Sequence, residues 1–479
     1  MSSPPRAQSD TALSPQRLVY ESVIDAIGHT PLVRLNRLAA DVAPSIYLKL
    51  EYLNPGGSVK DRAAREMILA AERDGSLGPG GVVVEGTSGN TGIGLAIVAA
   101  ARGYRTIVVV PDKTSADKIG LLRGVGAEVV VTPGGRPVGH PEHVRSVAER
   151  ITAETPGGWL AGQYDNPANP DAHRRTTGPE LWEQTGGTIT HFVCGVGTGG
   201  TISGTGEYLK EVSGGAVKVL APDPVTSRYS GGDGRSYAIE SIGHYLHPDT
   251  VEDVWPQSYH PEVVDEFIAV TDREAIDTAQ ALVAQEGLLV GGSGALAVAG
   301  ALRAAATLSA DDVVVVLIPD SGRNYLSKYF DETWRVERGF GTSSASEGPV
   351  LRDLGGGGYR GVPTTATLAQ ARSIADGLSV VPVHLPRASE AVVGAEIVGS
   401  VDLGALAAVD PDARVADHLG PVPPLAGIDE PASTVADRVG AQPIVVVLEN
   451  GYATAILATP ALAAAVSSGI DRGEDDGPK

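Results

Sequence analysis

The sequence predicts an α/β protein built on parallel sheets. From about residue 20 to residue 340, short apolar runs alternate with alanine-rich stretches, as in GGVVVEG followed by IGLAIVAAARG and RTIVVVPD followed by SADKIGLLRGVG. This alternation is typical of the strand–helix–strand units of a doubly wound sheet. Runs such as VVVVLI at 313–318 are too short to span a membrane and are typical of buried parallel strands.

The length, net charge and cysteine content of the chain further limit the class of protein to which it can belong. The 479 residues suggest two or three domains, and the formal net charge of −21 argues against nucleic acid or an anionic membrane as the main partner. The single cysteine, Cys194, permits no intrachain disulfide and no zinc site, so we expect a cytoplasmic protein without a metal. Residues 1–17 lack the apolar core of a signal peptide and are expected to form a disordered leader.

The segment NPGGSVKDR, residues 54–62, follows the apparent strand IYLKLEYL. Its two glycines allow the backbone to approach a ligand closely. Lys60 lies three residues after them. This lysine is either a solvated surface charge or a group that faces a bound molecule.

Three more glycine-containing segments lie where an apparent strand leads into a helix. EGTSGNTGIG, residues 85–94, offers hydroxyls and backbone N–H groups at a helix N-terminus, where a carboxylate or phosphate binds favourably. GLLVGGSG, residues 287–294, places Ser293 after a glycine pair at a strand end. The third, HFVCGVGTGGTISG at 191–204, contains a compact GTGGT loop that suits a phosphate.

The same GTGGT segment also fits a dinucleotide-binding fingerprint. Gly195, Gly197 and Gly200 satisfy G-x-G-x-x-G, and Asp223 follows at the end of the next apolar run. A nicotinamide enzyme is therefore an alternative on this loop alone. The combination favours another class, because a lysine, a phosphate loop and a carboxylate loop are what pyridoxal phosphate needs to act on an amino acid.

Several segments resemble cystathionine β-synthase and cysteine synthase, the fold-type II pyridoxal phosphate enzymes. The similar segments are GHTPLVRLNRL, YLKLEYLNPGGSVKDRAA, EGTSGNTGIGLA, PANPDAHRRTTGPE, VGTGGTISGTG, EGLLVGGSG and LIPDSGRNYLSKYFDETW. The resemblance covers about residues 20–340 and implies two doubly wound α/β subdomains within a catalytic domain at 18–340.

The resemblance also implies roles for individual residues. Lys60 resembles the lysine that holds the cofactor covalently and acts as the catalytic base, Asn90 the residue that binds the pyridine hydroxyl, and Ser293 the partner of the pyridine nitrogen. Tyr164 lines the substrate pocket, and Cys194 is expected to be a buried residue without a catalytic role. The phosphate loop corresponds to Gly197, Thr198, Gly199, Gly200 and Thr201, and the binders of the substrate carboxylate to Thr87, Ser88, Thr91 and Gln163.

The expected reaction is condensation of serine with homocysteine to cystathionine. Gly94 and the RNY of PDSGRNY resemble cystathionine β-synthases more than cysteine synthases. Ser241, in ESIG, replaces the glycine usual in the family, so the acceptor thiol stays open. Cysteine synthase, using O-acetylserine and sulfide, is the enzymatic alternative, and a catalytically silent cofactor-binding partner protein is the other.

Two further expectations follow from the relatives. Residues 1–28 contain neither cysteine nor histidine, so we expect none of the N-terminal haem that some relatives carry. Relatives in this group bury a large face of the catalytic domain between subunits, which implies a homodimer or homotetramer.

The C-terminal part contains an internal repeat after a linker expected at 341–358. EIVGSVDLGALAAV at 396–409 resembles TAILATPALAAAV at 454–466. Residues 359–467 resemble a pair of CBS domains, an α+β regulatory module, followed by an acidic disordered tail at 468–479. Where such modules use an aspartate to bind ribose, the repeats have Ala405 and Ala461, so we expect a degenerate module that does not sense adenosine ligands.

Overall fold

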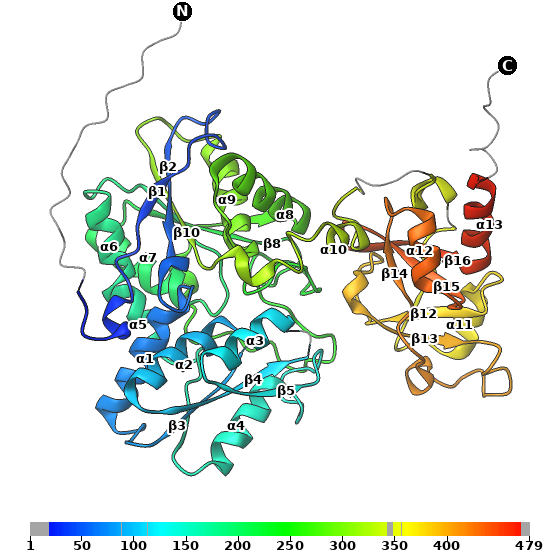
Figure 1. The fold of residues 1–479 in the computed structure, drawn as a ribbon, viewed down its shortest axis with the longest axis horizontal. Helices are drawn as coiled ribbons and strands as arrows, with labels where there is room; N and C mark the ends of the chain where they lie inside the picture. Colours follow the sequence, from blue (N-terminus) through cyan, green and yellow to red (C-terminus); the bar gives the residue numbers. More distant parts are fainter. Residues whose placement is uncertain (1–18, 88, 113, 343–347, 356, 471–479) are drawn as a thin grey trace, which may run out of the picture.

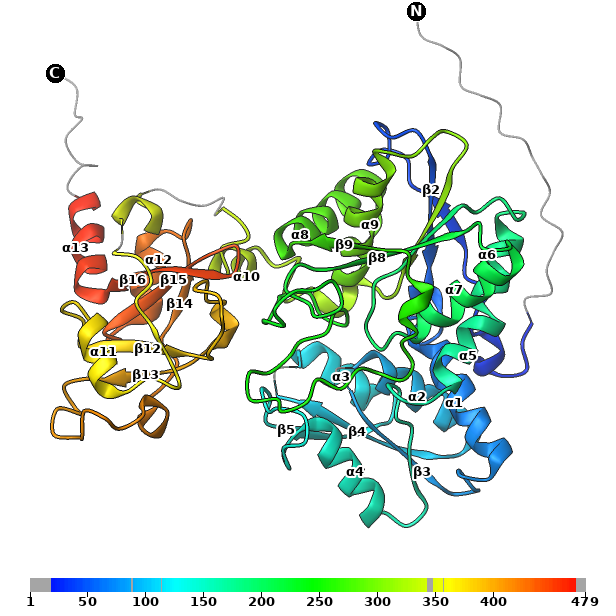
Figure 2. The ribbon, with the colours of Figure 1, turned by 180° about the vertical axis from the view of Figure 1, so that it is seen from behind.

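The computed structural model describes residues 19–470 except 88, 113, 343–347 and 356. Figures 1 and 2 show a larger body, formed by the chain up to about residue 340, beside a smaller C-terminal body. The expected leader and acidic tail fall almost entirely outside the described residues. No helix among the residues described combines the length and apolar composition needed to cross a bilayer.

The larger body contains a six-stranded sheet with the order β1-β2-β10-β7-β8-β9. The β1–β2 pair is antiparallel and the other four pairs are parallel. In this sheet, both faces of its central strands are covered, which explains the unbroken valine runs of the sequence. The strands are β1 (Leu32–Arg34), β2 (Ser45–Leu50), β7 (His191–Val193), β8 (Lys218–Pro224), β9 (Glu266–Val270) and β10 (Val313–Ile318).

A second sheet of four parallel strands has the order β5-β4-β3-β6. Its strands are β3 (Val82–Gly86), β4 (Arg105–Pro111), β5 (Glu128–Thr132) and β6 (Gly158–Leu160). Figure 1 shows this sheet below the first one, with helices packed against both. The predicted pair of doubly wound subdomains is confirmed.

The helices follow the alternation of the sequence. Helices α1 and α2 each end at a glycine in the left-handed conformation, Gly75 with φ +80° and Gly103 with φ +81°. The α-helices of the larger body are α1 (Lys60–Asp74), α2 (Asn90–Arg102), α3 (Ala116–Gly124), α4 (Val144–Glu154), α5 (Ala168–Arg175), α6 (Thr177–Gln184), α7 (Gly200–Val212), α8 (Asp272–Ala281), α9 (Gly292–Ala305) and α10 (Glu332–Glu337).

One local expectation was wrong. No strand precedes Ser293 in the GLLVGGSG segment, where Val290 makes only an isolated bridge with Ser321. A π-helical turn at Leu282–Glu286 comes before it, and Ser293 lies in the first turn of α9. The segment has the apolar character of a strand because Val290 is buried in the core.

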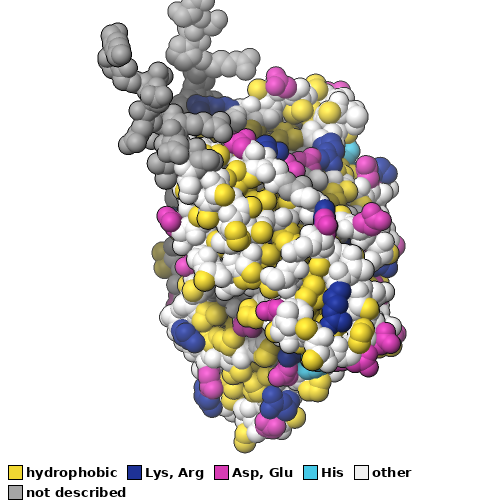
Figure 3. Space-filling model, turned by 90° about the vertical axis from the view of Figure 1, so that its right-hand side faces the viewer, with side chains coloured by type: hydrophobic (Ala, Val, Ile, Leu, Met, Phe, Trp, Pro, Cys, Tyr) yellow, Lys and Arg dark blue, Asp and Glu magenta, His cyan; other side chains and the backbone are white. Residues whose placement is uncertain are grey.

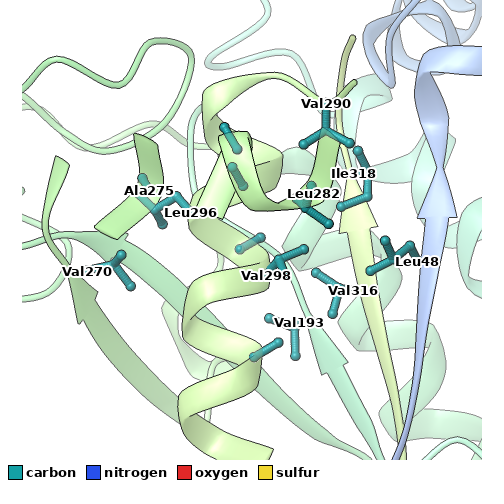
Figure 4. Packing of buried hydrophobic residues seen from close by; sticks show 14 of the residues in the cluster. Leu48, Val193, Val270, Ala275, Leu282, Val290, Leu296, Val298, Val316 and Ile318 are labelled. Carbon is teal, nitrogen blue, oxygen red and sulfur yellow. The ribbon is translucent and has the colours of Figure 1, made fainter. Parts of the chain in front are cut away.

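The largest core cluster packs α9 against the six-stranded sheet. Leu296 and Val298 of α9 and Val316 and Ile318 of β10 are all fully buried. Figure 4 shows these side chains facing one another between the helix and the strands. Burying each such side chain contributes about 1.5–3 kcal/mol, so this cluster holds α9 firmly to the sheet.

The smaller body contains two three-stranded sheets with the same topology. In the orders β11-β12-β13 and β14-β15-β16, the first pair is parallel and the second antiparallel. The elements are β11 (Val362–Pro363), α11 (Leu368–Ile374), β12 (Val380–His384) and β13 (Ile397–Asp402) in the first copy, and β14 (Leu425–Gly427), α12 (Ala432–Val439), β15 (Ile444–Glu449), β16 (Tyr452–Ala458) and α13 (Thr459–Ile470) in the second.

The strand register supports the alignment of the two repeats. Asp402 pairs with Val380 in the first sheet, and Ala458 pairs with Ile444 at the same place in the second. The copies differ after this point, because the second continues into α13 whereas residues 403–408 form turns.

Figure 3 looks onto the side of the molecule that lies at the right of Figure 1, where apolar side chains alternate with scattered charges.

A buried ion pair within the smaller body also forms hydrogen bonds to the larger one. Arg387 and Glu396 approach to 2.6 Å, with side chains 9% and 1% exposed. Glu396 accepts the backbone N–H of Ser236 at 3.0 Å, and Arg387 donates to the backbone carbonyl of Leu246 at 2.9 Å. The C-terminal body therefore braces the segment 236–246, which lines the cavity described below.

The close crossing of α5 and α7 depends on one glycine. A Cβ on Gly204 would lie 1.9 Å from the carbonyl oxygen of Pro170, a backbone atom that cannot move aside. We expect Gly204→Ala to lower the free energy of unfolding by about 1–3 kcal/mol or more through overpacking. Denaturant titration would measure the change.

Gly120→Ala is the matched control for this prediction. Gly120 lies inside α3, and a Cβ there would meet no atom within 4 Å. Because glycine costs a helix interior about 0.5–1 kcal/mol relative to alanine, this variant should be slightly more stable than the parent chain. Equal stability of the two variants would contradict the packing argument.

Candidate active site

Three of the four glycine-containing segments line one cavity of about 1890 Å³. Lys60 is the first residue of α1, and the turn before it is fixed by a hydrogen bond of 2.8 Å from the backbone N–H of Val59 to the carbonyl of Pro319. Ser88 lies outside the described residues. The predicted site residues that line the cavity are Lys60, Thr87, Asn90, Thr91, Gln163, Tyr164, Gly197 and Thr198.

Lys60 is half-buried, and its surroundings alter its acidity. Burial lowers the pKa of the Lys60 amine, and the nearby carboxylate of Asp320 opposes that shift. A lowered pKa raises the fraction of neutral amine, which is the form that can attack a carbonyl or accept a proton. Cys194 is fully buried, and burial raises its thiol pKa to about 12, which keeps it protonated.

One side of the cavity carries hydroxyl and amide groups from the TSGNT and GQY segments. Thr91 donates to the side-chain oxygen of Gln163 at 2.5 Å. Glu85, at the end of β3, accepts the backbone N–H groups of Gly162 at 2.8 Å and Gln163 at 3.4 Å. Burial raises the pKa of Glu85 to about 7. Glu85 thus fixes the chain at Gln163, a role that the sequence did not reveal.

The GTGGT loop leads into α7 with its backbone N–H groups at the start of the helix. Gly199 has φ +89°, and a Cβ there would lie 2.3 Å from Tyr259 Cβ, so this position requires glycine. Gly199, Gly200, Thr201 and Ser293 do not line the cavity itself but lie in the buried turns next to it. The start of a helix of this length is a favourable place for a phosphate.

Two residues of α5 hold the hydroxyls of this loop. Asn169 donates to Thr198 Oγ1 at 3.0 Å, and His173 Nε2 lies 3.2 Å from Thr201 Oγ1. Burial lowers the pKa of His173 to about 3, with Arg62 adding to the shift, so the imidazole is neutral. Their spacing of four residues places both on one helix face. The four-residue spacing of Asn169 and His173 is visible in the segment PANPDAH, but the sequence does not show which groups these side chains bind.

Asn90 and the turn before Ser293 both contact Asp320, a second buried acidic residue. Asn90 Nδ2 donates to Asp320 Oδ2 at 2.7 Å, and the Tyr325 hydroxyl donates to the same atom at 2.6 Å. The backbone N–H of Gly291, two residues before Ser293, donates to the Asp320 carbonyl at 3.0 Å. Asp320 therefore joins the turn that carries Ser293 to the residue predicted to bind the pyridine hydroxyl.

Buried polar atoms without partners gather in this region. Asn90 Oδ1, Ser293 Oγ, Asn169 Oδ1 and Asp320 Oδ1 have no hydrogen-bond partner among the described residues. An orphaned buried polar atom costs about 1–3 kcal/mol, so such a group is expected where a polar ligand binds. A ring hydroxyl can donate to Asn90 Oδ1 and a ring nitrogen can accept from Ser293 Oγ, so a hydroxylated pyridine fits these two atoms.

The position of Asp223 does not favour the dinucleotide alternative. Asp223 is fully buried in β8 and accepts the backbone N–H of Ser230 at 3.0 Å. It does not line the cavity. Its carboxylate holds the 227–230 turn. The match of GVGTGG to the dinucleotide-binding fingerprint therefore reflects only the glycines of the phosphate loop.

The ESIG segment forms another wall of the cavity. Glu240 binds Lys118 at 2.5 Å and also contacts Lys328. Ser241 has φ +67°, a left-handed conformation, and its carbonyl oxygen would lie 3.0 Å from a Cβ on Gly197. The usual glycine at position 241 thus suits this backbone, which serine adopts with strain.

The fold and the site together define a pyridoxal-phosphate-dependent enzyme. Residues 23–320 match the family described as "Pyridoxal-phosphate dependent enzyme", and the chain belongs to this family.

Relatives with known names support the resemblance to cystathionine β-synthase and cysteine synthase. "Cystathionine beta-synthase" of Apis mellifera is 43% identical over 324 residues, which are 67% of this chain and 64% of that protein. The match thus spans less than two thirds of the Apis mellifera protein. "Probable cysteine synthase" of Bacillus subtilis (strain 168) is 46% identical over 313 residues, 64% of this chain and 97% of that protein.

The solved structure of O-ureido-L-serine synthase is similar in fold. It has a TM-score of 0.60 and 36% identity, and the match covers 69% of this chain and 98% of that one. The remainder of the present chain has no counterpart in that match.

The strain at Ser241 generates a prediction. A residue other than glycine in the left-handed region costs about 1–2 kcal/mol, so Ser241→Gly should raise the free energy of unfolding by about 1 kcal/mol. Ser236→Gly, in the same segment but with an ordinary φ, is the control and should lower it or leave it unchanged. Thermal or denaturant unfolding of both variants would measure this. Destabilisation by Ser241→Gly would contradict the strain.

Proposed function

We propose that the chain catalyses a pyridoxal phosphate-dependent β-replacement, which condenses L-serine with L-homocysteine to form L-cystathionine. The observation that carries this proposal is the placement of Lys60 in a cavity whose wall holds the hydroxyl and amide groups of Thr87, Thr91 and Gln163. The similarity to proteins named cystathionine beta-synthase supports it.

Each residue group has a task in the proposed reaction. Thr87, Thr91 and Gln163, together with Ser88, hold the carboxylate of the amino acid substrate. The cofactor supplies an electron sink that makes the α-proton acidic. Lys60, with its lowered pKa, takes that proton as general base. The loop Gly197–Thr201 would hold the phosphate of the cofactor, and Asn90 would hold its ring hydroxyl.

Ser293 sets the strength of the electron sink. Its hydroxyl is neutral, whereas a carboxylate in its place would keep the pyridine nitrogen protonated. With the cofactor bound, a neutral partner at this position would make it a weaker electron sink. This suits a β-replacement better than a transamination or racemisation.

Cysteine synthase remains the second candidate function. Ser241 occupies a glycine position in the segment next to Lys118 and Lys328, and the "Probable cysteine synthase" of Bacillus subtilis is matched over 97% of its length. In this alternative the donor is O-acetylserine and the acceptor is sulfide.

We also propose that residues 359–467 form a degenerate pair of CBS domains that does not respond to adenosine ligands. Asp402 accepts the backbone N–H groups of Gly404 at 2.9 Å and Ala405 at 3.0 Å, so its carboxylate is used within its own turn. At the equivalent place in the second copy, Ala458 and Ala461 have no side-chain acceptor. We place the enzyme in the cytoplasm as a homodimer or homotetramer.

The deciding experiment supplies the purified, cofactor-loaded protein with serine and homocysteine and detects cystathionine by mass spectrometry. The same protein is then given O-acetylserine and sulfide. We expect the first pair to react with the higher kcat/KM and S-adenosylmethionine to leave the rate unchanged. A clear preference for the second pair would establish the cysteine synthase alternative, and clear activation would contradict the proposal for the C-terminal module.

A further inference from the structure

We propose that Arg145 binds the carboxylate of the second, acceptor substrate, which would make that substrate a thiol-bearing amino acid. This inference rests on the proposed β-replacement and specifies its acceptor. Arg145 is the second residue of α4 and lines the same cavity as Lys60. No sequence motif drew attention to it.

The position of Arg145 is fixed by an aromatic contact. Its guanidinium carbon lies 3.8 Å from the centroid of the Tyr164 ring. His143, at the N-terminus of α4, accepts the backbone N–H of Arg145 at 3.3 Å. A guanidinium that stacks through its face keeps the N–H groups at its edge available, and their planar arrangement matches a carboxylate. The stacking thus fixes the orientation of the Arg145 guanidinium and leaves the N–H groups at its edge free to donate hydrogen bonds.

Several other cations that line or border the cavity are already paired with carboxylates. Lys118 and Lys328 both contact Glu240. Arg136 pairs with Glu142 at 2.8 Å. Arg145, in contrast, stacks on Tyr164 and makes no ion pair and no side-chain hydrogen bond with any residue that the structure describes. Glu85 is the nearby acid that interacts with it electrostatically, and burial raises the pKa of Glu85 to about 7, so its charge is incomplete at neutral pH.

The location favours the acceptor over the donor. The donor carboxylate has its own binders, Thr91 and Gln163, which are hydrogen-bonded to each other. Arg145 contacts Tyr164, the residue after Gln163, and so lies beside that subsite without belonging to it. A guanidinium at this place without a carboxylate partner can bind an anionic group of a second substrate. Homocysteine carries such a group, whereas sulfide offers nothing for a bidentate guanidinium to hold.

Arg145→Met tests this proposal, because methionine keeps an apolar contact with Tyr164 and removes the charge. We expect the KM for homocysteine to rise about 10- to 100-fold, as expected for loss of a charge-assisted bidentate hydrogen bond. The KM for serine and the kcat at saturating acceptor should stay within about twofold, a change too small to indicate a lost hydrogen bond. Arg145→Lys should recover part of the affinity, since it restores the charge without the fork.

Arg136→Met is the matched control. Arg136 lines the same cavity, but its charge already pairs with Glu142. This variant should leave the KM for homocysteine within about twofold of the parent value, because exposed ion pairs contribute little. An equal effect of both variants would show that general charge, and not Arg145, attracts the acceptor.

Two simple thiols separate this inference from the proposed function. 3-Mercaptopropionate has a carboxylate and cysteamine has none, and each is offered with serine and, separately, with O-acetylserine. Arg145→Met should raise the KM only for the thiol acid, even if the wild-type enzyme proves to prefer O-acetylserine. Titration calorimetry of the cofactor-loaded protein with 3-mercaptopropionate should show the same loss of affinity without turnover.

Four outcomes would overturn the assignment. A rise in KM for the donor alone would place an anionic group of the donor at Arg145. An equal loss with both thiols would indicate a structural role, as would a fall in melting temperature that accounts for the loss. Unchanged binding of the thiol acid would show that Arg145 does not contact the acceptor.

Discussion

The placement of Lys60 depends on Arg62, a fully buried arginine two residues later in α1. Its guanidinium binds Glu51 at 2.7 Å and Glu180 at 2.7 Å, and Lys49 completes the group by binding Glu180 at 2.7 Å. Two positive and two negative side chains thus balance inside the protein. A buried charge that loses its partner costs about 3–5 kcal/mol, so this network permits one arrangement of the segments that carry it.

These segments bring the rest of the site into place. Glu51 follows β2 of the six-stranded sheet, Arg62 lies in α1, and Glu180 lies in α6. Helix α1 packs on α2, which carries Asn90 and Thr91, and on α5, which carries Asn169 and His173. The charge of Arg62 also helps to lower the pKa of His173, after the larger effect of burial. The same network therefore fixes Lys60 and keeps the imidazole beside the phosphate loop neutral.

Much of this architecture could be predicted from the sequence, because parallel strands and glycine loops have local signals. The valine runs of β3, β4 and β10 and the glycines of the 197–201 loop are examples. Glu85, Arg145 and His173 could not be assigned, since each acts through a contact with a distant part of the chain. The replacement of the usual glycine by Ser241 was visible in the sequence. Only the structure shows that this serine has a left-handed backbone next to Gly197.

The central claim is that Lys60 carries the cofactor, and reductive trapping tests it most directly. Borohydride treatment of the yellow, cofactor-loaded protein should fix the pyridoxyl group irreversibly to one lysine. Peptide mapping should then find the label on the peptide that contains Lys60, and Lys60→Ala should remain unlabelled with its fold intact by circular dichroism. A label on another lysine, or labelling of Lys60→Ala to the same extent, would contradict the account.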